Sequence, residues 1–306
     1  MIEIHWRGGR PGADGPFYAL LILGLGLLAA LLGFIAHHSA ALAERAVDTC
    51  LAVADSVAAI PSALLIPWAV VSVMVGFAVV AALWQVLATR ALLAGLLRRR
   101  IDAPDGLARM VEAVGLTAVD LVGDERPFAF CYGLLRPRVC LTTAMVDLLA
   151  PCELEAVLRH ERHHQASRDP LKILVSRSLG VGLFFLPAAQ DLLDRYMVGK
   201  EVAADAEAAD AARSELPLAT ALFKLLSHGG ATLPSTVAAI GAFNLTEERI
   251  QRMVRGVPAG RARVDVRRLA LSGLVIAAIF AVSYLPLAAS STPVSDECGQ
   301  VTTLIP

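Results

Sequence analysis

Charged side chains are scarce in this sequence, and neither sign of charge predominates. Asp, Glu, Lys and Arg make up 18% of the 306 residues, hydrophobic residues make up 56%, and the formal net charge is −1. The mean hydropathy of +0.62 is above what a soluble enzyme shows. A basic surface that binds nucleic acid directly is therefore excluded, and the low charge content indicates a protein of the lipid bilayer.

Charge is entirely absent from three long stretches, residues 17–36, 57–89 and 269–289. Each stretch is long enough for a helix that crosses a bilayer, and we expect spans at about 17–36, 62–89 and 269–289. For the first stretch, a cleaved signal peptide is the alternative. Its apolar region would be shorter, roughly 7–15 residues, and Ala40-Ala41-Leu42-Ala43 is a loose match to a cleavage site.

Arginine clusters at 90–100 and 261–268 flank the second and third stretches. Positively charged residues beside a span stay on the cytoplasmic side of the membrane. We therefore expect a multi-pass protein of the cell membrane, with residues from about 90 to 268 in the cytoplasm and the C-terminal tail outside.

The expected topology places the five cysteines on two different sides of the membrane. Cys50 and Cys298 fall on the outer face, and only this pair meets an oxidising compartment. Our hypothesis is a Cys50–Cys298 disulfide, and the alternative is two unpaired small apolar residues near span ends. Cys131, Cys140 and Cys152 fall in the cytoplasmic part.

Composition changes near residue 100, where charges begin to alternate with apolar residues. We expect a two-helix transmembrane hairpin in 1–100, a cytoplasmic α+β domain in 101–260, and a final span with a short outer tail in 261–306. Two β-like runs, Phe128-Ala129-Phe130-Cys131-Tyr132 and 138–142, flank a turn and predict a small β-hairpin. The expected fold class is a mainly α membrane protein with a small sheet.

The clearest indication of a catalytic site is the run His160-Glu161-Arg162-His163-His164. Histidines four residues apart on a helix share one face, so His160 and His164 can bind one Zn²⁺. Glu161 lies beside that ion as a candidate general base. His163 points away from this face and is expected to be solvated or to support the site, and His228, followed by two glycines, is expected to end a helix.

Three acidic residues after the motif are candidates to complete the site. Glu201 and Asp205 lie four residues apart on an alanine-rich helical stretch, so Glu201 can be the third ligand and Asp205 can accept the second ring N–H of a ligand histidine. Asp169 is another candidate acceptor or a helix-end residue. A full crossing at 171–189 would separate Glu201 from the histidines, so we expect a buried or re-entrant helix there.

Several stretches together resemble the BlaR/MecR-type family of membrane zinc metallopeptidases, which are gluzincins. They are residues 127–130, 133–139, 153–161, 168–171 and 201–205. The resemblance implies one catalytic Zn²⁺ held by His160, His164 and Glu201. It also implies that Glu161 is the catalytic base and that the strand at 128–132 is an edge that receives an extended substrate peptide.

The sequence departs from the antibiotic-sensing relatives in one respect. Those relatives carry a penicillin-binding domain after the last span, where this sequence has only residues 290–306. The implied role is a differently triggered endopeptidase in signal transduction, which cleaves itself or a BlaI/MecI-type winged-helix repressor. An HtpX-like membrane quality-control protease and, from another class, a catalytically silent membrane sensor or scaffold remain alternatives. The residues do not specify the oligomeric state.

Overall fold

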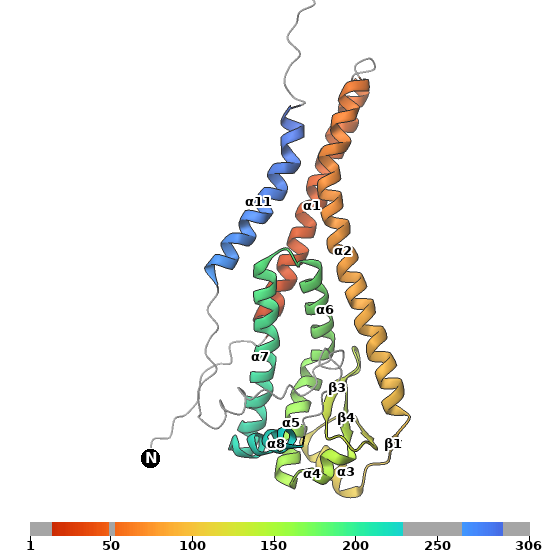
Figure 1. The fold of residues 1–306 in the computed structure, drawn as a ribbon, viewed down its shortest axis with the longest axis vertical. Helices are drawn as coiled ribbons and strands as arrows, with labels where there is room; N and C mark the ends of the chain where they lie inside the picture. The colour runs from red at the N-terminus through yellow and green to blue at the C-terminus, as the bar shows by residue number, and fades with distance from the viewer. Residues whose placement is uncertain (1–13, 49–52, 229–264, 290–306) are drawn as a thin grey trace, which may run out of the picture.

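A computed structural model of the chain describes residues 14–48, 53–228 and 265–289. The molecule is elongated, with long helices at one end and a small mixed domain at the other (Figure 1). It is mostly helical and contains one four-stranded sheet. The fold class expected from the sequence is therefore confirmed. Cys50 and Cys298 lie outside the described residues.

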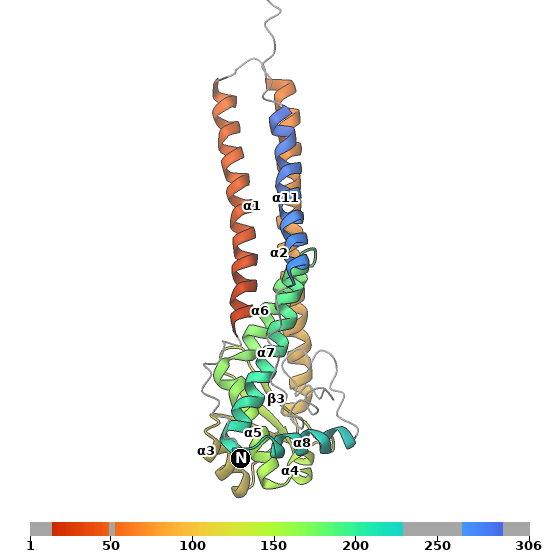
Figure 2. The same cartoon turned by 90° about the vertical axis from the view of Figure 1, so that its left-hand side faces the viewer.

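Three of the described helices are long and apolar enough to cross a bilayer. They are α1 (Gly15–Asp48), α2 (Val53–Leu97) and α11 (Val266–Ala289), with candidate spans Gly15–Ser39, Leu65–Leu97 and Val266–Tyr284. Helix α2 continues to Leu97, past the expected span end at residue 89, because residues 90–97 are mostly leucine and alanine. These two extra turns bring α2 onto the domain (Figures 1 and 2).

The sheet has the strand order β1-β2-β4-β3. Its strands are β1 (Arg100–Ile101), β2 (Val119–Val122), β3 (Ala129–Tyr132) and β4 (Arg138–Thr142). Strands β3 and β4 form an antiparallel hairpin, whereas β2 pairs with β4 in parallel and with β1 in antiparallel orientation. Strand β3 therefore lies at an edge of the sheet.

The two faces of the sheet pack against different helices, because successive side chains of a strand point to opposite faces. One face, with Ala129, Val139 and Leu141, joins the main core with helix α5 (Pro151–Ser167). The opposite face packs on the last turns of α2. That second cluster contains Phe128, Phe130, Tyr132, Cys140 and Val122 with Leu92, Leu93, Leu96 and Leu97.

Shorter helices complete the domain around α5. They are α3 (Asp105–Val114), α4 (Thr143–Leu148) and α8 (Leu216–Ser227). Leu107 and Val114 of α3, Met145 of α4, and Leu218 and Leu222 of α8 enter the same core as the sheet. Helix α5 is thus enclosed at the centre of the domain.

Helices α6 (Asp169–Gly182) and α7 (Pro187–Ala212) form a hairpin that rises from the domain and returns to it (Figure 1). The tip packs among the long helices, where Leu183 and Leu186 join a cluster with Leu20 and Leu31 of α1. Gly182 permits close packing, since a Cβ there would lie 2.7 Å from the Met74 carbonyl oxygen. Because the chain turns back at the tip, the end of α7 reaches the domain beside α5.

Candidate metal centre

Helix α5 begins at Pro151, whose missing N–H is not required in the first turn. The Ala150 N–H donates to Glu153 Oε2 at 2.8 Å, and Lys224 of α8 donates to the same oxygen at 2.6 Å. Leu154, Val157 and Leu158 then pack in the core at helical spacing. This register buries the next turns of α5, so that His160, Glu161 and His164 are 0%, 0% and 1% exposed.

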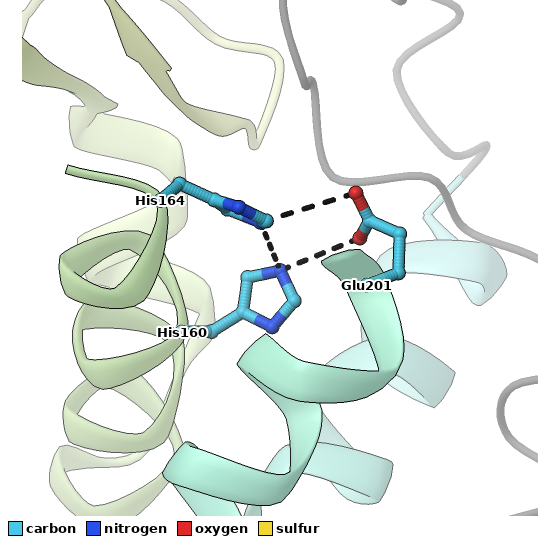
Figure 3. A group of neighbouring side chains, drawn as sticks. All are labelled: His160, His164 and Glu201. Carbon is cyan, nitrogen blue, oxygen red and sulfur yellow. Dashed lines mark hydrogen bonds and ion pairs between the residues drawn. The ribbon is translucent and has the colours of Figure 1, made fainter. Parts of the chain in front are cut away.

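His160 and His164 meet Glu201 of α7 at one point (Figure 3). The His160 and His164 Nε2 atoms are 3.1 Å apart, His160 Nε2 is 3.6 Å from Glu201 Oε2, and His164 Nε2 is 3.9 Å from Glu201 Oε1. Ligand atoms on a tetrahedral zinc ion with bonds of about 2.0–2.1 Å lie about 3.3 Å apart. The three side chains therefore fit a metal ion, as the grouping of their ligand atoms within 4.8 Å also indicates.

Two aspartates lie behind the histidines. His164 Nδ1 is 2.6 Å from Asp169 Oδ2, and His160 Nδ1 is 3.1 Å from Asp205 Oδ1. A carboxylate that accepts the Nδ1 proton leaves Nε2 as the free ligand atom. Burial lowers the pKa of His164 to about 4, although the hydrogen bond to Asp169 acts in the opposite direction. The imidazole is thus neutral near pH 7, which is the form that binds metal.

The link between α5 and α6 explains how Asp169 reaches His164. Arg168 has a φ of 54°, in the left-handed region, and its N–H bonds the Gln165 and His164 carbonyl oxygens at the end of α5. This residue ends α5 and reverses the chain. Asp169 then starts α6 directly beside the last turn of α5, with its side chain facing back to the metal centre.

Helix α5, which carries Glu161, packs against the edge strand β3. Burial, together with the negative charge of Glu161, raises the pKa of the Cys131 thiol of β3. Phe128 O accepts from the Thr142 N–H at 3.2 Å. Because hydrogen-bonded and non-bonded pairs alternate in an antiparallel ladder, the backbone groups of Ala129 and Cys131 point away from β4. They face the edge of the sheet at which β3 pairs with no other described strand.

This arrangement agrees with the family comparison. The sequence matches the BlaR1 peptidase M56 family over residues 34–253, which is more than half of the chain. The chain belongs to this family. A search of the curated proteins found no match. The resemblance to BlaR/MecR-type membrane peptidases expected from the sequence is therefore confirmed, and the chain is a membrane peptidase by family.

Two other histidines in the domain of this M56 peptidase lie outside the metal centre. His163 faces Glu207 of α7, with Nδ1 2.8 Å from Oε2, and Arg162 donates to the other oxygen of Glu207 at 2.9 Å. His228 lies exposed at the end of α8, with Nδ1 2.9 Å from the Lys224 carbonyl oxygen. His228 ends α8 as expected from the sequence, and His163 lies away from the face of His160 and His164.

Two residues near the centre carried no sequence signal. Gln165 links α5 to the segments that precede β2 and β4. It accepts from the Thr117 N–H and donates to Pro137 O, both at 3.0 Å. Lys200 precedes Glu201 on α7, is 1% exposed, and its Nζ contacts Glu201 Oε1. Neither residue belongs to a recognisable motif, and only the position of Lys200 beside a candidate ligand could have drawn attention to it.

Proposed function

We propose that this protein is an integral-membrane zinc endopeptidase that hydrolyses a protein on the cytoplasmic side. The observation that carries the proposal is the convergence of His160, His164 and Glu201 beside Glu161, all of them buried. Two imidazoles and one carboxylate form a donor set of catalytic zinc sites that keep a fourth position open for water. A structural zinc site would instead have four protein ligands.

The chain's own residues supply the proton transfers and the ligand geometry. When bound, zinc would supply Lewis-acid activation of water and of the scissile carbonyl. Glu161 takes a proton from the attacking water and then gives it to the leaving amine. Asp169 and Asp205 keep the ligand histidines in the tautomer whose Nε2 faces the ion.

Strand β3 is the proposed binding edge for the substrate. An extended peptide that pairs with an exposed strand edge gains main-chain hydrogen bonds at alternate residues. Ala129 and Cys131 offer such groups on a strand that contacts α5, the helix of Glu161. N-methylation of a peptide substrate at successive positions tests this, because we expect KM to rise at alternate positions only. A uniform response along the peptide would contradict strand addition.

The described conformation is closed. Ala129 and Cys131 are 0% and 1% exposed, and Glu161 is fully buried. A peptide must therefore displace the atoms that cover the edge and the metal centre before it is cleaved. This favours an enzyme that acts after a trigger, and we propose itself or a BlaI/MecI-type winged-helix repressor as the substrate, with an HtpX-like quality-control role as the alternative.

A cleavage assay with Glu161→Gln tests the proposal. Full-length protein in detergent is incubated with casein and with a candidate repressor, and products are mapped by mass spectrometry. We expect the wild type to cleave and Glu161→Gln to lose at least about 100-fold in rate, since a general base contributes roughly 10²–10⁴-fold. Equal cleavage by both proteins would contradict the role of Glu161 as the general base. Metal binding with no cleavage of any substrate would favour the silent sensor or scaffold.

A further inference from the structure

Lys200 is a charged residue in an unusual place. Its side chain is 2% exposed, and it lies next to Glu201 on α7. Lysine is almost never fully buried unless an opposite charge pairs with it, since removing an ammonium group from water is unfavourable. Here the partner is Glu201, because Nζ contacts Oε1 of that candidate ligand.

The two oxygens of Glu201 have different surroundings. Oε2 lies 3.6 Å from His160 Nε2, and Oε1 lies 3.9 Å from His164 Nε2 and also contacts Lys200. Both oxygens are thus near enough to the histidines for a bidentate carboxylate, which would add a fifth ligand and crowd the position that a catalytic zinc ion needs for water. Because the Lys200 ammonium group contacts Oε1, the two Glu201 oxygens are not equivalent as metal ligands.

We propose that Lys200 is a positioning residue that holds Oε1, so that Glu201 binds the metal through Oε2 alone and the fourth coordination position stays open. The proposal rests on the proposed function, because it assumes a metal ion at His160, His164 and Glu201. The positive charge of Lys200 also competes with the ion for the Glu201 carboxylate. Lys200 therefore lowers metal affinity while it preserves an open site.

The experiment compares Lys200→Met with Lys200→Arg, Lys200→Gln and a matched control. Lys200→Met keeps a long unbranched side chain without charge, Lys200→Arg keeps the charge, and Lys200→Gln is a second uncharged variant if the methionine variant does not fold. Lys224→Met is the control, since it removes another lysine–glutamate pair, Lys224 with Glu153 at 2.6 Å, away from the metal centre. All proteins are full-length and in detergent.

Two readouts do not depend on peptidase activity. In the Co²⁺-substituted proteins, we expect the visible absorption of Lys200→Met to fall by about half, because coordination by both Glu201 oxygens raises the coordination number from four to five. In competition with a chromophoric chelator, we expect the zinc affinity of Lys200→Met to rise about tenfold, because a nearby positive charge is gone. Lys200→Arg and Lys224→Met should match the wild type in both readouts.

Each outcome has a defined meaning. A wild-type cobalt spectrum and zinc affinity in both Lys200→Met and Lys200→Gln would overturn the role of Lys200 while leaving the metal centre intact. Failure of the wild type to bind Co²⁺ or Zn²⁺ would overturn the proposed function together with the role of Lys200. Where the spectrum and affinity change as expected, kcat should fall in Lys200→Met with little change in KM.

Discussion

At the scale of single residues, the proposed function assigns Asp169 and Asp205, which pair with the two candidate ligand histidines, a role in metal binding. Loss of a carboxylate that orients a ligand histidine costs about 10–100-fold in metal affinity. We predict a loss of this size for zinc in Asp205→Ala, whose carboxylate lies 3.1 Å from His160 Nδ1. Chelator competition measures it. Exposed Asp210 on the same helix supplies the control Asp210→Ala, and equal affinities in the two variants would refute the orienting role.

The ligand residues could be predicted from sequence because helical spacing alone determines their relation. His160 and His164 share a face at any helix position, and Glu201 and Asp205 repeat the same interval. Lys200 could not be predicted in this way. Its burial depends on how α7 packs against α5, and a single lysine in a sequence looks the same whether its side chain is buried or solvated.

At the scale of elements, one carboxylate links all four strands of the sheet. Asp120 of β2 accepts from Arg138 of β4 at 2.6 and 2.8 Å, pairs with Arg100 of β1 at 3.0 Å, and accepts from the Tyr132 hydroxyl of β3. Burial alone would raise the pKa of Asp120, but the hydrogen bonds from Arg138 and Tyr132 and the two arginine charges lower it below its usual range. The edge strand is therefore held partly by this ion cluster.

We predict that Asp120→Asn lowers stability by about 2 kcal/mol at neutral pH, since hydrogen bonds to a charged group contribute roughly 1.5–3 kcal/mol. The folded-state pKa is lowered, so the stabilisation is present above the unfolded value of about 3.9 and is lost as the pH falls through the folded value. Thermal unfolding of both proteins in detergent, from pH 8 down to pH 3, measures it. A difference that grows on acidification would contradict the assignment.

The hairpin of β3 and β4 was predicted because its two apolar runs flank a glycine-containing turn. Strands β1 and β2 were not predicted. They are only two and four residues long, too short to show an alternation of apolar and polar residues, and the parallel partner of β2, β4, is distant in the sequence. The segment 171–189 is divided between α6 and α7, since Pro187 starts a new helix after the turn.

At the scale of the whole molecule, the long helices lie at one end, and the domain that contains the sheet and α5 lies at the other (Figure 2). The arginine clusters predict that the domain is cytoplasmic. Cys152 at the start of α5 is exposed and free, and therefore reports on the side of the membrane that the domain occupies.

We predict that a variant retaining only Cys152 is protected from a membrane-impermeant maleimide in intact spheroplasts and is labelled after permeabilisation. A variant retaining only Cys50 is the control, because the same topology places Cys50 outside. Immunoblotting of the mass-tagged protein measures the labelling. Modification of Cys152 in intact spheroplasts would reverse the proposed orientation.

The central proposal is a peptidase whose buried candidate metal centre, at His160, His164 and Glu201, works only with a bound ion. Zinc content measured together with peptide hydrolysis tests this most directly. The account predicts about one zinc per wild-type chain, no zinc in the double variant His160→Ala/His164→Ala, and hydrolysis that stops on chelation and returns with added zinc. Hydrolysis that persists in zinc-free protein, or in the double variant, would contradict it.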